Sequence, residues 1–109
     1  MNERMLYHMQ RGSALLLAPL VLIHIVVILY AIRGGLTGAE ILGRTRGSLV
    51  WGGYYGIFVA LAALHAPIGV RNVLREWTTW RGRSLDMAMV AFGVVLLVLG
   101  LRGVFAVVA

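Results

Sequence analysis

The segment SALLLAPLVLIHIVVILYAI, residues 13–32, decides the fold of this chain. It contains no Asp, Glu, Lys or Arg, and a helix of about 20 residues crosses about 30 Å of hydrocarbon. Two more apolar stretches of similar length follow, at about residues 48–70 and 85–108. The sequence therefore predicts an all-α integral membrane protein with three transmembrane helices, in which residues 1–109 form a single domain.

The amino-acid composition limits the classes of function that this chain can have. Hydrophobic residues make up 61% of the 109 residues and charged residues only 13%, so little sequence remains for a soluble active site. The net charge of +6 comes from arginines that flank the apolar stretches, a pattern that favours lipid head groups over nucleic acid as the partner. Without cysteine, the chain can form no disulfide and ligate no iron–sulfur cluster. The first apolar run is too long for a signal peptide and has no small-residue cleavage site after it, so we expect it to be retained.

The arginines also predict the orientation. Arg33, Arg44 and Arg46 lie in the first connector, residues 33–47, with Arg102 late in the third span. The N-terminal segment and the second connector, residues 71–83, share the other side of the membrane. That side holds Arg4, Arg11, Arg71, Arg75, Arg81 and Arg83. This bias predicts a multi-pass protein of the inner (cytoplasmic) membrane with its N-terminus in the cytoplasm. We further expect the connector at 33–47 to be a polar break rich in glycine, and Ser48 to cap the second span.

The second span contains an ionisable ring, His65. Histidine is costly inside lipid and usually faces a helix bundle, a water-filled cavity or a cofactor. At about 100° per residue, Gly69 and Asn72 share the face of His65, and Gly69 is expected to leave clearance for a flat macrocycle. A stripe of small residues on nearly the opposite face is typical of close helix packing. Its members are Gly52, Gly56, Ala60 and Ala63.

The surroundings of His65 favour haem over zinc. Zinc needs three or four clustered ligands, and no second histidine follows His65 at the spacing of one helical turn. A b-type haem needs one neutral imidazole from each chain, a clear face and cations for its propionates. We therefore predict His65 as an axial ligand, with Arg11 and Arg71 near the propionates. The alternatives are a hydrogen bond from His65 to a neighbouring helix, and a role in topology and lipid contact for the arginines.

His24 in the first span is a second candidate ligand. It lies deeper from the predicted cytoplasmic edge than His65, by about 10 Å of helix rise. One iron cannot easily bind both rings, so two metal centres would be needed, each completed by another chain. The alternative for His24 is also a hydrogen bond to a neighbouring helix. Its predicted stripe on the first span comprises Ser13, Leu17, Leu20, His24, Val27 and Ala31.

These features resemble the membrane-anchor subunits of succinate:quinone oxidoreductase, the complex II family that includes fumarate reductases. The resemblance covers most of the chain and comprises three spans, Arg11-Gly12-Ser13 at the start of the first, and His65 to Arg71 at the end of the second. An acidic and an aromatic residue, Glu76 and Trp77, then follow His65 by 11 and 12 positions. The resemblance implies that His65 ligates a haem b shared by two anchor subunits, and that this chain is half of a heterodimeric anchor bundle.

The resemblance also implies a quinone site bordered by Arg11, Ser13, Glu76 and Trp77. The small anchor subunit usually has aspartate and tyrosine where this chain has Glu76 and Trp77. An indole N–H can donate a hydrogen bond but cannot accept one, so anchoring at the membrane interface is an alternative role for Trp77. The segment 69–71 is more like the large anchor subunit, but the chain as a whole is more like the small one. His24 resembles the first-span histidine of members that bind two haems.

The function implied is that of a non-catalytic subunit of succinate dehydrogenase. It would dock an iron–sulfur subunit and a flavoprotein together with a second anchor subunit, and pass electrons from succinate to quinone. One alternative is a small multi-helix transporter, although compact exporters use a buried acid in the first span, which is missing here. The other is a haem-free structural membrane subunit.

Overall fold

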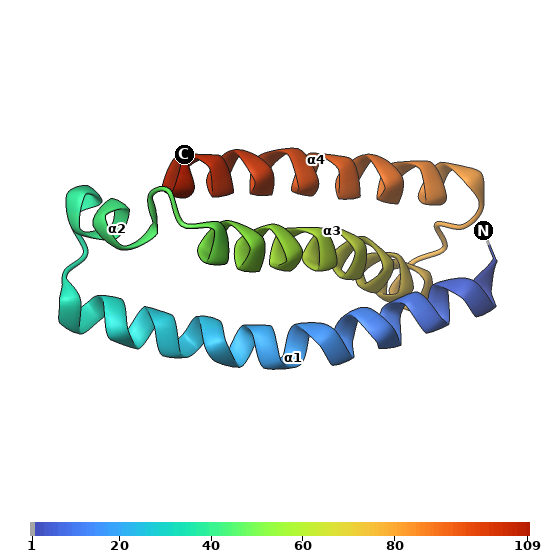
Figure 1. The fold of residues 1–109 in the computed structure, drawn as a ribbon. Coiled ribbons are helices and arrows are strands. Elements are labelled where there is room, and N and C mark those ends of the chain that lie inside the picture. The colour runs from blue at the N-terminus through green and yellow to red at the C-terminus, as the bar shows by residue number, and fades with distance from the viewer. Residues whose placement is uncertain (1) are drawn as a thin grey trace.

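The computed structural model describes residues 2–109 and consists of four helices joined by short connections (Figure 1). The helices are α1 (Glu3–Gly34), α2 (Gly38–Thr45), α3 (Leu49–Trp77) and α4 (Arg83–Val108). Three of them, α1, α3 and α4, are long and apolar enough to cross a membrane. The prediction of an all-α protein with three spans is confirmed, and residues 2–109 contain no strand.

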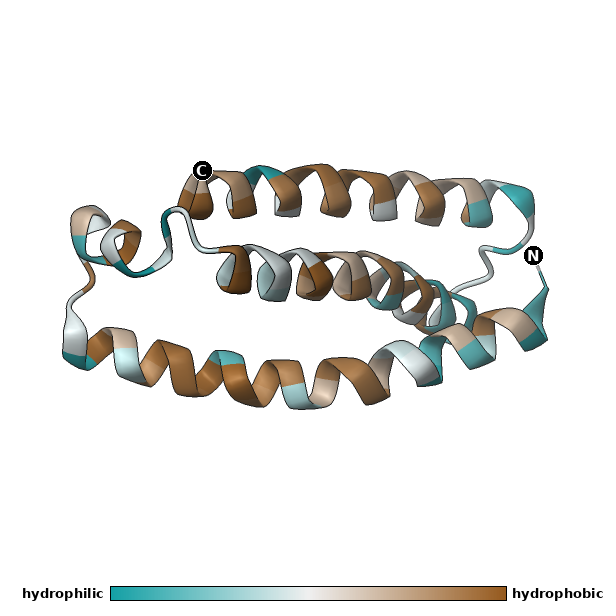
Figure 2. Ribbon diagram, in the orientation of Figure 1, coloured by the Kyte–Doolittle hydropathy of each residue, from teal (hydrophilic) through white to brown (hydrophobic). Residues whose placement is uncertain are grey.

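The three long helices lie side by side with α3 in the centre (Figure 1). Helix α3 packs against both α1 and α4, whereas α1 and α4 hardly contact each other. The N-terminus and the α3–α4 connection lie at one end of the bundle (Figure 1). We call it the six-arginine end, after Arg4, Arg11, Arg71, Arg75, Arg81 and Arg83. Helix α2 and the C-terminus lie at the other, the α2 end. Figure 2 shows mostly hydrophobic residues along the middle of the long helices and hydrophilic residues toward the ends, as a membrane requires.

Capping side chains set the helix starts. Asn2 Oδ1 accepts hydrogen bonds from the main-chain N–H of Arg4 and Met5, so α1 begins well before the apolar run at residue 13. The predicted cap of α3 is confirmed, because Ser48 Oγ accepts a hydrogen bond of 3.1 Å from Trp51 N. Helix α3 then continues to Trp77. Arg71 and the following residues to Trp77, which were predicted to lie in the second connector, are thus helical.

The first connector contains a helix that the sequence analysis did not predict. Thr37 and Glu40 form a capping box that starts α2. At its other end, Thr45 Oγ1 and Gly47 N donate hydrogen bonds to the main-chain oxygens of Val107 and Val108. These oxygens belong to the last turn of α4 and have no partner inside their own helix. Helix α2 is thus a cap for α4 as well as a connection.

On α1, the predicted stripe faces the bundle. Ser13 and Leu17 are buried, while Leu20, His24, Val27 and Ala31 are partly buried among neighbours that are mostly exposed. Glycines bring α4 close to α3. A β-carbon on Gly93 would lie 3.1 Å from the main-chain oxygen of Ala63, and one on Gly100 would lie 2.5 Å from Val59 Cγ1. Close contact at small residues is what stabilises helix pairs in lipid.

Replacing Gly100 with alanine should weaken this packing. The new methyl group collides with Val59, whose branched side chain has little rotamer freedom in a helix, and overpacking of this kind costs about 1–3 kcal/mol. Thermal unfolding in detergent, followed by circular dichroism, measures the loss. Gly103→Ala is the matched control, because no atom lies within 4 Å of its β-carbon position. The additional change Val59→Ala should restore most of the stability, and a failure to do so would contradict the collision.

Candidate functional site

His65 lies beside Ser13, where α1 crosses α3. Ser13 Oγ is 3.2 Å from His65 Nδ1, and Ser13 is only 3% exposed. Within residues 2–109, this contact is the one hydrogen bond of the imidazole. The structure therefore brings together two of the residues singled out from the sequence, although Ser13 was assigned to a quinone and not to the histidine.

The Ser13 hydroxyl has two acceptors within hydrogen-bonding distance. Its Oγ is 3.0 Å from the main-chain oxygen of Gln10 and 3.2 Å from His65 Nδ1, and its single hydrogen can be donated to only one of them. When the hydrogen goes to Gln10, Ser13 accepts from the Nδ1–H of His65, and Nε2 keeps a lone pair that can bind a metal.

Gln10 of α1 borders the space that the missing side chain of Gly69 leaves. Gln10 Nε2 would lie 3.2 Å from a β-carbon on Gly69, so a macrocycle at this position would require the Gln10 side chain to move. Because Gly69 has no side chain, α1 can pack closely against α3 at this level. Gln10 Oε1 is buried and has no hydrogen-bond partner within residues 2–109.

Arg71 is the centre of an ion network that joins the three spans. Its Nε lies 2.8 Å from Asp86 Oδ1 on α4, and its Nη2 lies 2.5 Å from Glu3 Oε1 on α1. Arg75 Nη1 adds a contact of 2.9 Å to Glu3 Oε2. Arg71 is 5% exposed, so its charge is compensated within the chain. Glu3 and Asp86 already bind Arg71, so a haem propionate in the predicted position would have to share Arg71 with these two carboxylates.

Glu3 lies outside the apolar run of α1, and the arginines of the ion network lower its pKa. The hydrogen bond from Arg71 holds the pKa of the Glu3 carboxyl below its ordinary value of 4.5. A lowered pKa means that folding favours the ionised form. The stabilisation from this pair is therefore complete above pH 4.5 and is lost as the pH falls through the lower value of the folded state.

The other residues predicted to border a quinone are at the same end but apart from Ser13. Arg11 Nη1 donates to Tyr7 Oη at 3.1 Å, and Arg11 lines a hollow that also includes Asn72. A second hollow, of about 310 Å³, joins Asn72 to Glu76. Trp77 is 82% exposed at the end of α3. Arg11 and Glu76 thus border adjacent hollows that meet at Asn72, while Ser13 and Trp77 line neither.

His24 is surrounded by aromatic rings. Its ring makes edge contacts with Tyr55 and Phe58 of α3, with centroids 6.1 and 5.4 Å away. Its Nδ1 is buried and has no partner in the described part of the chain. Ser13, the neighbour of His65, precedes His24 by 11 residues on α1, or about 16 Å of helix rise. The two histidines therefore lie at different levels of the bundle, as the sequence predicted.

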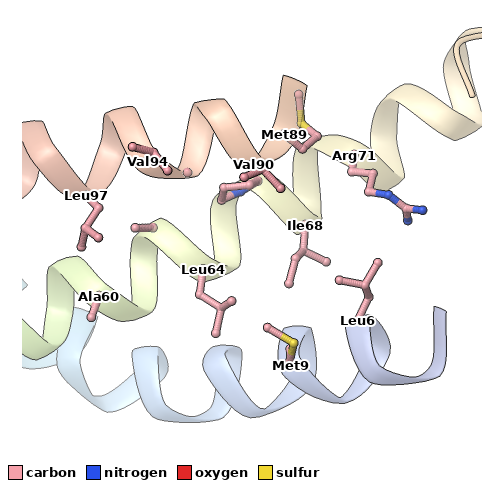
Figure 3. A pocket seen from close by; sticks show the side chains of 13 residues that line it. Leu6, Met9, Ala60, Leu64, Ile68, Arg71, Met89, Val90, Val94 and Leu97 are labelled. Atoms are coloured by element: carbon pink, nitrogen blue, oxygen red, sulfur yellow. The ribbon is translucent and has the colours of Figure 1, made fainter. Parts of the chain in front are cut away.

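An apolar groove of about 410 Å³ opens between the three long helices (Figure 3). Figure 3 shows Leu64 and Ile68 of α3 directed toward Leu6 and Met9 of α1. Neither His65 nor His24 lines it, and Arg71 is its one charged residue. The groove can hold hydrocarbon, and its lining contains no histidine, carboxylate or thiol, with the thioethers of Met9 and Met89 as its only groups able to bind a metal.

No group of three or more His, Cys, Asp or Glu residues is gathered around a common point in residues 2–109. Glu3 and Asp86 were not predicted as partners of Arg71, nor was Gln10 predicted as a neighbour of the His65 site. Pairing across helices has no local sequence signal, so only the presence of acids near span ends could have suggested it.

The fold and these contacts define a three-span α-helical membrane protein with a serine-oriented histidine near the six-arginine end. Comparison of the chain with protein-family models, curated proteins and solved structures finds no match.

Replacing Arg71 with glutamine should lower the free energy of unfolding by about 2 kcal/mol. Breaking a fully buried pair costs about 3–5 kcal/mol, and the effect is smaller here because the side chain of Glu3 is 55% exposed. The matched control Arg75→Gln removes one ion pair of a partly exposed side chain and should cost under about 1 kcal/mol. Thermal unfolding in detergent tests both. The gap between wild type and Arg71→Gln should narrow below pH 4.5, where Glu3 becomes protonated. Equal effects of the two substitutions would contradict the network.

Proposed function

We propose that this chain is a membrane-anchor subunit of a succinate:quinone oxidoreductase and that His65 supplies one axial ligand to a haem b. The observation that supports this most is the hydrogen bond between Ser13 and His65 Nδ1. With the Nδ1–H of His65 donating to Ser13, Nε2 is left unprotonated to bind iron, and the hydrogen bond limits rotation of the ring. A haem b bound there would carry one electron at a time between the soluble subunits and quinone.

The residues of the chain fit the group in part. Ser13 and His65 provide an oriented ligand, and Arg11 has free N–H donors for a propionate because its one hydrogen bond within residues 2–109 goes to Tyr7. Arg71 is a less available cation, since Glu3 and Asp86 already bind it. The opposite axial ligand is proposed to come from a second anchor subunit, because no other histidine of this chain lies at the level of His65.

The six-arginine end is proposed to dock the iron–sulfur subunit and, through it, the flavoprotein. Arg4, Arg81 and Arg83 are exposed there, and a basic surface suits an acidic one. The quinone is proposed to bind at the same end, bordered by Glu76 and Trp77 of α3 with Arg11 and Ser13 of α1 nearby. We propose that this end faces the cytoplasm and that the complex lies in the inner membrane.

Replacing His65 with alanine should remove the dithionite-reducible b-type absorption of the purified complex, because one axial ligand is lost. Ser13→Ala keeps the imidazole but removes the acceptor for its Nδ1–H, and loss of such an outer partner lowers metal affinity about 10–100-fold. We therefore expect partial haem loss and a shifted midpoint potential in Ser13→Ala. Ala14 is a lipid-exposed neighbour of Ser13, and Ala14→Ser is the matched control. An unchanged spectrum in an assembled His65→Ala complex would disprove the assignment.

Replacing His24 with alanine tests a second, distal haem. If the complex holds two haems per flavin, this change should delete one of two redox transitions and leave the His65 centre titrating as before. The physical reason is the separation of the two histidines along the bundle. Quantifying haem per flavin and titrating the b-type band gives the answer. A ratio near one, or two unaltered transitions in the variant, would assign His24 to packing against Tyr55 and Phe58.

A further inference from the structure

A polar hollow of about 400 Å³ lies between α1 and α3 at the six-arginine end. Its lining differs from that of the apolar groove, because five of its six residues have a polar or charged group. The hollow is lined by Glu3, Leu6, Tyr7, Gln10, Arg11 and Asn72. Its residues on α1 precede the apolar run that starts at residue 13, which places the hollow at the level of lipid head groups.

Gln10 gives the hollow an acceptor that lacks a donor. Gln10 Oε1 is buried and has no hydrogen bond within residues 2–109, and leaving a buried acceptor unpaired is unfavourable. The terminal torsion of a glutamine side chain is soft, so a rotation of the carboxamide brings this oxygen to the wall of the hollow. An acceptor in this position selects a ligand with N–H or O–H groups. A phosphate without such groups, or a quinone, offers only acceptors.

Charges of both signs border the same hollow. Arg11 uses one of its five N–H donors on Tyr7 Oη, and the others suit phosphate oxygens. Glu3 lies eight residues earlier on α1, about 12 Å along the helix, and its carboxylate is already paired with Arg71 and Arg75. The available cation and the unpaired acceptor in one hollow match a zwitterion that has a phosphate and an ammonium group.

We propose that the hollow binds the head group of one phosphatidylethanolamine lipid, with its phosphate at Arg11 and its ammonium group donating to Gln10 Oε1 and to the side-chain oxygen of Asn72. Phosphatidylcholine has the same charges but no N–H donor, so it cannot satisfy Gln10. The inference does not rest on the proposed function, but the two share Arg11, so a lipid phosphate at this residue would exclude a haem propionate or a quinone from it.

A series of lipids with identical acyl chains tests the donor requirement without any mutation. The full-length chain, isolated in mild detergent, is titrated with phosphatidylethanolamine, its N-methyl and N,N-dimethyl derivatives, and phosphatidylcholine. Native mass spectrometry measures the lipid retained, and the melting temperature provides a second readout because a bound lipid stabilises the folded chain. We expect retention to fall with each methyl group, by about fivefold in total, which is what one or two net hydrogen bonds provide. Equal retention across the series would overturn the proposal.

Variants assign the preference to the hollow. Gln10→Leu keeps the size of the side chain but removes the acceptor, so the preference for phosphatidylethanolamine should disappear while phosphatidylcholine binding is retained. Met9→Leu is the matched control, because Met9 is next to Gln10 in the sequence but lines the apolar groove instead of the polar hollow. This variant should keep the preference for phosphatidylethanolamine. Circular dichroism confirms that both variants are folded. A preference that survives Gln10→Leu, or a lipid that a short-chain benzoquinone displaces, would overturn the assignment.

Discussion

The buried charge of Arg71 is the constraint on which the arrangement of the spans depends. An arginine is always ionised, so burying it requires carboxylate partners, and these come from the other two spans, Glu3 of α1 and Asp86 of α4. Helices α1 and α4 hardly contact each other directly. The network is therefore what connects them at the six-arginine end. The same register of α1 against α3 places Ser13 beside His65.

A different kind of contact organises the rest of the bundle. Lipid chains are as apolar as leucine, so the hydrophobic effect does not drive helices together inside a membrane, and close packing and hydrogen bonds do. Gly93 and Gly100 let α4 approach the backbone and side chains of α3. At the far end, Thr45 and Gly47 bond to the last carbonyl groups of α4. Each end of α4 is thus held by polar contacts, with close packing between them.

Much of this fold could be predicted from the sequence, because the length of an apolar stretch and the spacing of small residues are local properties. Ser48 as a cap of α3 follows from the same local reasoning. Helix α2 was missed because the glycines around residue 35 were read as a break, although the Thr37–Glu40 capping box was visible in the sequence. The partners of Arg71 and the filling of the space at Gly69 by Gln10 depend on how α1 lies against α3. No pattern within one helix contains that information.

The two histidines also differ in the contacts that neighbouring helices provide. Ser13 Oγ contacts Nδ1 of His65 from a neighbouring helix, so this ring has a hydrogen-bond partner within the chain. His24 Nδ1 is buried near Tyr55 and Phe58 and finds no partner within residues 2–109. For His24 to bind a metal through Nε2, its Nδ1–H would need an acceptor from another chain as well as the remaining metal ligands. A centre at His24 would therefore depend on assembly for the orientation of its imidazole, whereas the orientation of His65 is already set by this chain.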